Sequence, residues 1–135
     1  MNPKFIEIIK EKIAYQFEIE TVDNRVFIVF PAKSLDFGDV DICEESLGEY
    51  IVTVGNFSHS HFDRYDGSDD ERVVSAAEDV ASFLKNLFSD RIICFGSHEC
   101  GGGYYFNDIG DIHELADERD DLFVWSGIFR KAQPI

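Results

Sequence analysis

The stretch DDERVVSAAEDVASFLKNLF, residues 69–88, decides the fold of this chain. An α-helix turns by ~100° per residue, and at that angle the stretch separates into an apolar and a polar half. The apolar half consists of Val73, Val74, Ala76, Ala77, Val80, Ala81, Phe83, Leu84, Leu87 and Phe88. The polar half consists of Glu71, Arg72, Ser75, Glu78, Asp79, Ser82, Lys85 and Asn86. This pattern predicts a helix with one half packed on a core and the other half in solvent.

The start of this helix carries capping signals. Ser68 suits the N-cap position, and Glu71 three residues later completes the sequence of a capping box. Asp69 and Asp70 suit the positive end of the helix dipole. Burial of about six large side chains, at roughly 1.5–3 kcal/mol each, contributes on the order of 10–15 kcal/mol before conformational entropy is subtracted.

The residues before this stretch predict a first helix and then a hairpin. Asn2 can cap a helix that has Pro3 at its favoured first position. From residue 17 the apolar period changes to two, so 17–23 and 25–30 read as strands joined at the turn signal Asp23–Asn24. Apolar residues on both faces of 25–30 indicate an interior strand.

The remaining segments complete an α+β pattern. We expect strands at 40–43, 50–57, 91–96, 104–108 and 122–131, with Gly127 as a bulge in the last one. Residues 58–67 are expected to form a loop, and 108–121 a loop or short helix. The order α-β-β-β-β-α-β-β-β predicts one domain over 1–135. In it, a mainly antiparallel sheet packs against the long helix, about 69–89, and against the N-terminal helix.

Charge restricts the classes of partner. The chain has 27 acidic and 12 basic residues, a net charge of −15 at pH 7, so it should repel nucleic acid and anionic membranes. It suits a basic protein partner, although acidity also serves solubility alone. Three cysteines at no metal-like spacing suggest a reducing compartment, and no stretch resembles a signal peptide or membrane span. We therefore expect a cytoplasmic protein that needs no cofactor.

One motif points to metal chemistry. His59, His61 and Asp63 have the His-x-His-x-Asp spacing that opens the zinc motif of metallo-β-lactamase-type hydrolases. Arg64 stands where that family continues with His, and the chain is short for that fold. With His98 as a further ligand, these residues form the alternative hypothesis of a small metal-dependent hydrolase. The simpler interpretation is a polar loop that positions the start of the long helix.

Two segments concentrate acidic residues. Residues 36–49 carry six acids and no base, and 108–121 carry seven acids against Arg119. Each could be a solvated loop, but together they predict a carboxylate-lined surface that attracts a basic protein.

In size, charge and α+β layout, the chain resembles the small acidic immunity proteins of bacterial toxin systems, including contact-dependent growth inhibition. The resemblance implies a non-enzymatic domain that neutralises a basic cognate toxin, such as a nuclease domain, by covering its active site. It also implies the toxin-facing residues, which would be Asp36, Asp39, Asp41, Glu44 and Glu45, or Asp108, Asp111, Glu114, Asp117 and Glu118. A third hypothesis is a structural or regulatory binding domain without a toxin partner.

Overall fold

The two helices form where the sequence predicts them. The computed structural model describes residues 1–99, 101–106 and 121–131 and has helices α1 (Pro3–Lys12) and α2 (Asp69–Phe88). Asn2 caps α1 by accepting a hydrogen bond from the Lys4 amide at 2.9 Å. The Ser68 hydroxyl caps α2 by accepting from the Glu71 amide at 3.2 Å.

Five antiparallel strands form sheet A in the order β1-β2-β3-β4-β5. They are β1 (Glu18–Val22), β2 (Arg25–Phe30), β3 (Val40–Ser46), β4 (Glu49–Val54) and β5 (Ser58–Asp63). Asp23 and Asn24 both have positive φ, as the tight β1–β2 turn requires, which confirms the predicted hairpin. The strand over 25–30 lies between β1 and β3, as predicted.

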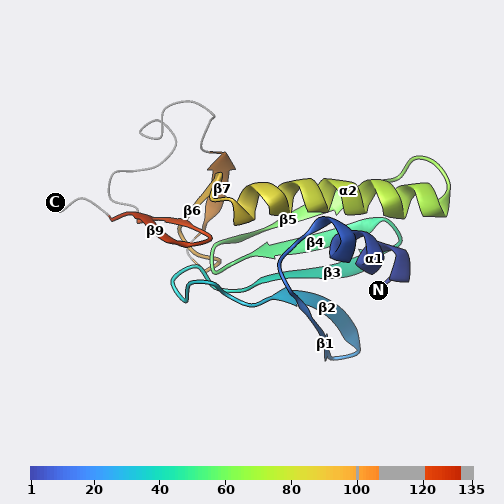
Figure 1. The fold of residues 1–135 in the computed structure, drawn as a ribbon, viewed down its shortest axis with the longest axis horizontal. Coiled ribbons are helices and arrows are strands. Elements are labelled where there is room, and N and C mark those ends of the chain that lie inside the picture. Colours follow the sequence, from blue (N-terminus) through green and yellow to red (C-terminus); the bar gives the residue numbers. More distant parts are fainter. Residues whose placement is uncertain (100, 107–120, 132–135) are drawn as a thin grey trace.

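Four further strands form sheet B in the order β7-β6-β8-β9. They are β6 (Ile92–Phe95), β7 (Gly103–Phe106), β8 (Leu122–Val124) and β9 (Gly127–Arg130). Sheet B lies beyond the C-terminal end of α2 (Figure 1). Trp125, in the β8–β9 turn, is buried against Phe37 and Phe88 and joins sheet B to the main core.

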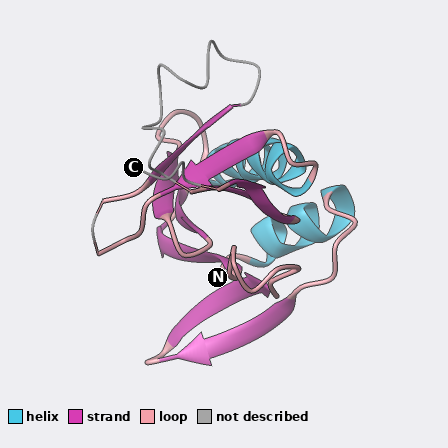
Figure 2. Ribbon diagram, turned by 90° about the vertical axis from the view of Figure 1, so that its left-hand side faces the viewer, coloured by secondary structure: helices cyan, strands magenta, loops and turns pink. Residues whose placement is uncertain are grey.

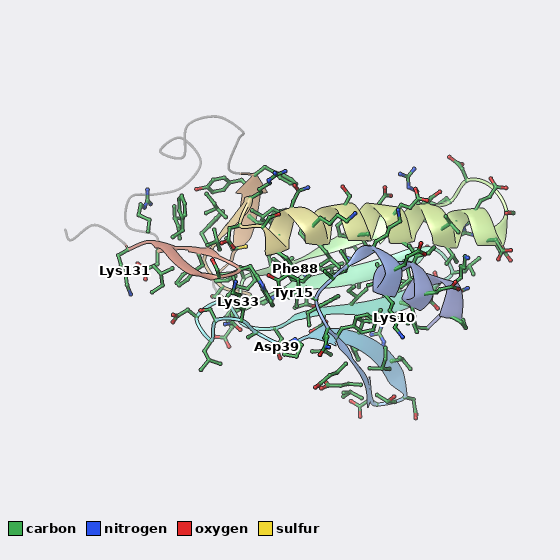
Figure 3. All side chains as sticks on the ribbon, viewed as in Figure 1. Lys10, Tyr15, Lys33, Asp39, Phe88 and Lys131 are labelled. Carbon is green, nitrogen blue, oxygen red and sulfur yellow. The ribbon has the colours of Figure 1, made fainter. Side chains whose placement is uncertain are left out.

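Both helices cover the same side of sheet A, which we call the inner face (Figure 2). The core between them includes Ile28, Phe30, Ile42, Tyr50, Val52, Val54, Leu84 and Leu87, all at most 1% exposed. Phe5 of α1 stacks on the Tyr50 ring with centroids 3.8 Å apart. Figure 3 shows Tyr15, after α1, beside Phe88 at the end of α2; their ring centroids are 4.8 Å apart.

The α+β class is confirmed, but three local predictions are wrong. The expected loop at 58–67 contains β5, which pairs with β4 along its whole length. The expected strand 50–57 stops at Val54 because Gly55 adopts a φ of 55° and the Phe57 amide bonds back to the Val54 carbonyl at 3.2 Å. The chain reverses at this tight turn, so residues 58–63 can pair with β4 as an additional strand.

The predicted strand 122–131 is also wrong, because it is two strands folded into a hairpin. The chain turns at Trp125–Ser126, where the Ser126 amide donates to the Asp90 carboxylate at 3.1 Å. Gly127 is the first residue of β9 and pairs with Val124, so it is not a bulge within one strand. The observed order is α-β-β-β-β-β-α-β-β-β-β, and the strands divide into two sheets. Within residues 1–99, 101–106 and 121–131, no helix combines the length and apolar character needed to cross a membrane.

Candidate partner-binding face

The side of sheet A opposite the helices is a second surface, which we call the outer face. Strand alternation and the pairing register assign its side chains. They are Glu18, Glu20, Val22, Arg25, Phe27, Val29, Asp41, Cys43, Glu45, Glu49, Ile51, Thr53, His59, His61 and Asp63. Among the elements that the structure describes, no helix covers this face (Figures 1 and 2). An uncovered sheet face is available to a partner protein.

Rows of paired residues cross the outer face from edge to edge. One row runs Glu18, Val29, Asp41, Thr53, His59, and the next runs Glu20, Phe27, Cys43, Ile51, His61. In each row an acid or imidazole stands at the rim and an apolar side chain lies further in. The centre of the face therefore combines apolar side chains with one carboxylate, Asp41, and the rim is charged.

The outer face has an excess of negative charge. Its acidic residues are Glu18, Glu20, Asp41, Glu45, Glu49 and Asp63, and its arginine is Arg25. Arg25 Nη2 lies 2.9 Å from Glu45 Oε1 and 3.5 Å from Cys43 Sγ. This exposed ion pair contributes little to stability, and burial raises the pKa of the Cys43 thiol, which makes it a poor nucleophile at neutral pH.

Asp41 lies near the middle of this acidic surface and is half-buried. Burial raises the pKa of its carboxyl above the ordinary value; the hydrogen bond with Thr53 opposes the rise, and the negative charges of Asp39 and Glu20 add to it. The Asp41 carboxylate is therefore costly to ionise in the free protein. A cationic side chain placed beside it would remove part of that cost.

The histidines of the predicted metal motif lie at the β5 edge of the outer face. The ring centroids of His59 and His61 are 5.4 Å apart, and the His98 ring lies parallel to His59 at 6.2 Å. Asp63 follows on the same face of the strand. Within the described part of the chain, however, no group of three or more His, Cys, Asp or Glu side chains is arranged to hold a metal ion. The geometry lends no support to the hydrolase hypothesis.

The structure separates the acids of the first predicted cluster. Asp41 and Glu45 lie on the outer face, whereas Asp36 is exposed in the β2–β3 connection. Asp39 accepts a hydrogen bond from the Ala32 amide at 2.7 Å and closes that connection.

Glu44 points to the inner side of the sheet. Its Oε2 accepts from the Tyr50 hydroxyl at 2.7 Å and from the Asn2 amide at 3.1 Å, so it ties the start of α1 to the sheet. The five residues therefore do not form one surface. The second predicted cluster, Asp108, Asp111, Glu114, Asp117 and Glu118, lies outside the described residues.

Sequence reasoning missed the acids that complete the outer face. Glu18 and Glu20 have the same parity in the alternating segment 17–23, a signal that places them on one face of their strand. The β3–β4 register places Glu49 on the same face of the sheet. Their nearness to Asp41 depends on strand order, which local patterns do not specify.

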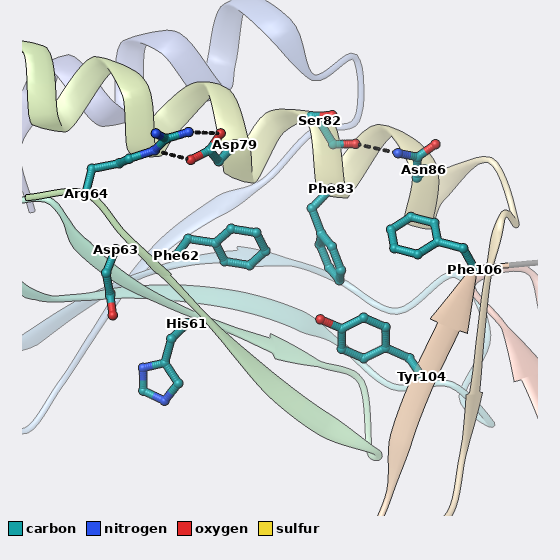
Figure 4. Close-up of a pocket in the computed structure, with 10 residues that line it drawn as sticks. All are labelled: His61, Phe62, Asp63, Arg64, Asp79, Ser82, Phe83, Asn86, Tyr104 and Phe106. Carbon is teal, nitrogen blue, oxygen red and sulfur yellow. Dashed lines mark hydrogen bonds and ion pairs between the residues drawn. The ribbon is translucent and has the colours of Figure 1, made fainter. Parts of the chain in front are cut away.

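A groove of about 570 Å³ opens beside this surface, between β5, α2 and β7 (Figure 4). Phe62 points into it toward Phe83, with ring centroids 5.3 Å apart, and Tyr104 closes the floor. On the rim, Arg64 makes a two-point ion pair with Asp79 at 2.7 and 3.0 Å. Arg64 and Asp79 therefore neutralise each other on the rim, which Asp63 and His61 also line.

Comparisons of the chain with protein-family models, with curated proteins and with solved structures found no match.

Proposed function

We propose that this protein is a non-enzymatic binding domain whose outer face captures a basic protein. The observation that carries the proposal is the outer face left free by both helices, where half-buried Asp41 pairs with Val29 and lies within the electrostatic influence of Glu20. Exposed carboxylates raise the rate of encounter with a cationic partner, and partly buried ones reward correct docking. The net charge of −15 acts in the same direction over a longer range.

The finer proposal is that the partner is a toxin and that this chain is its immunity protein. An acidic surface of this kind can block a basic nuclease by occupying the site where the phosphate backbone binds. The predicted toxin-facing acids Asp41 and Glu45 are part of the proposed surface. Glu44 is not included, because it bonds to Tyr50 and Asn2.

A matched pair of variants tests the binding surface. Glu20→Gln with Asp41→Asn removes two charges from the outer face, and Glu11→Gln with Glu78→Gln removes two charges from the exposed sides of the helices. The wild type and the helix variant should capture the same basic protein from a lysate of the source organism. The outer-face variant should bind it at least about tenfold more weakly, because close charge pairs across interfaces contribute roughly 1.5 kcal/mol or more. Equal affinity for all three would contradict the proposal.

Co-expression separates an immunity protein from other binding domains. The captured partner should inhibit growth when it is expressed alone, and the wild-type chain should restore growth. A harmless partner, encoded away from this chain in the genome, would support a regulatory binding domain instead. Rescue by the outer-face variant at the wild-type level would exclude the outer face as the neutralising surface.

A further inference from the structure

Strand β1 is an open edge of sheet A. One side of it pairs with β2 in five consecutive register pairs, from Glu18 with Val29 to Val22 with Arg25. On its other side no strand of the described residues pairs with it. Every residue of β1 is exposed, including Ile19 at 50% and Val22 at 53%. Natural edge strands are protected by charged side chains, proline or a bulge; β1 has no proline and no bulge, and its protection consists of the charges of Glu18 and Glu20.

The two sides of β1 differ in chemistry. Glu18 and Glu20 point to the outer face, where their rows continue to Val29, Asp41 and Phe27. Ile19 points to the inner face and lines a groove of about 430 Å³ with Ile6, Ile13 and Tyr15 of the α1 region; Lys10 and Gln16 also line this groove. A strand added beside β1 would therefore have one face against carboxylates and the other over a mainly apolar groove that places Lys10 near it.

This chemistry argues against a second copy of the chain as the added strand. Antiparallel pairing of two β1 strands about Glu20 places Glu20 opposite Glu20, and like charges in that position are destabilising. Two chains of net charge −15 also repel each other. The edge instead favours a strand of opposite charge.

From these observations we infer that β1 accepts a strand of the partner in which lysine or arginine alternates with branched apolar residues. The basic side chains lie against Glu18 and Glu20, and the apolar ones lie over Ile19 and the groove beside α1. Main-chain hydrogen bonds to the free edge supply affinity, and the alternation supplies specificity. The inference deepens the proposed function, because it assigns a backbone conformation to the basic partner.

A short acetylated peptide in which lysine alternates with valine is the probe. Two derivatives, N-methylated at the valines or at the lysines, remove the amide donors from opposite edges of the peptide strand while keeping its charge. Strand addition uses one edge, so one derivative should bind at least about tenfold more weakly than the other by fluorescence anisotropy. Equal affinities of the two derivatives, or no binding of the parent peptide, would overturn the inference.

Two protein variants of equal charge provide the second measurement. Ile19→Lys places a cation on the edge strand, and Leu35→Lys places one on a distant loop residue that is 93% exposed. Ile19→Lys should weaken peptide binding at least about fivefold, and Leu35→Lys by no more than about twofold. Equal weakening would mean that only net charge attracts the peptide. That result would reject the added strand while leaving the proposed function, tested by Glu20→Gln with Asp41→Asn, intact.

Discussion

The inner and outer faces of sheet A are built from the same strands but have opposite chemistry. On β3, Ile42 points inward and is fully buried, whereas its neighbour Asp41 points outward and is half-buried. On β4, Val52 points inward and Thr53 outward. The inner face is covered by α1 and α2, and neither of these helices covers the outer face. The inner face therefore supplies the core, and the outer face is the surface that we propose for recognition.

This separation has an energetic consequence. Burial of the inner side chains supplies the stability of the domain, at roughly 1.5–3 kcal/mol for each large side chain. The outer face holds several carboxylates near one another, and Asp41 is harder to ionise than an ordinary aspartate. The basic partner that we propose would offset this cost on binding.

The largest expected effect compares isoleucines on the two faces. Ile42→Ala should lower the free energy of unfolding by about 3 kcal/mol, because it leaves a cavity in a fully buried site. Ile51→Ala, at a half-buried outer position on the adjacent strand, should cost less than about 1.5 kcal/mol because the site opens to solvent. Urea denaturation followed by circular dichroism measures both. Similar losses would show that the outer face is part of the core.

A smaller effect concerns the helix that covers the inner face. Ser68→Ala removes the hydroxyl that accepts from the Glu71 amide and should cost about 1 kcal/mol. Ser75→Ala, within the same helix, removes a hydroxyl without uncapping it and should change stability by less than about 0.5 kcal/mol. Thermal denaturation of both variants gives the difference. A loss for Ser75→Ala as large as that for Ser68→Ala would contradict the capping role.

The smallest effect concerns the outer face and depends on pH. The folded state raises the pKa of Asp41, so between the unfolded and folded pKa values the folded state binds more protons, and stability falls as pH rises. Asp41→Asn should therefore stabilise the protein at pH 7, by less than about 1 kcal/mol because the group is partly solvated.

The gain should disappear as pH falls below about 4, where the carboxyl is protonated in both states. Chemical denaturation of the wild type and Asp41→Asn at several pH values measures this. A gain that is independent of pH, or a loss at pH 7, would show that the Asp41 ionisation is not the source of the effect.

Local patterns were sufficient for most of the fold. The stretch 69–88 and the turn Asp23–Asn24 have strong signals, because helix amphipathicity and positive-φ turns depend on neighbouring residues only. Strand β5 was missed because its sequence, SHSHFD, has one large apolar residue, and its other inner positions hold the small serines Ser58 and Ser60. The last hairpin was missed because Trp125, an apolar residue, occupies its turn and is buried there by tertiary packing.

The candidate site was less predictable than the fold. The acidic segment 36–49 pointed to Asp41 and Glu45, but strand alternation sends Glu44 inward, and the β2–β3 connection uses Asp39 as a hydrogen-bond acceptor. Glu18 and Glu20 belong to a different segment and reach Asp41 through the pairing of three strands. The density of charge along the sequence does not show which residues become neighbours across paired strands.

The buried Trp125 gives the molecule an internal optical reporter. It is the one tryptophan of the sequence, and its ring touches Phe37, Phe88 and, at 6.2 Å between centroids, Tyr15. These neighbours come from the β2–β3 connection, the end of α2 and the segment after α1. The environment of the indole therefore changes if sheet B separates from the rest of the domain. Its emission spectrum therefore records detachment of sheet B, while binding at the opposite face of sheet A should leave that spectrum unchanged.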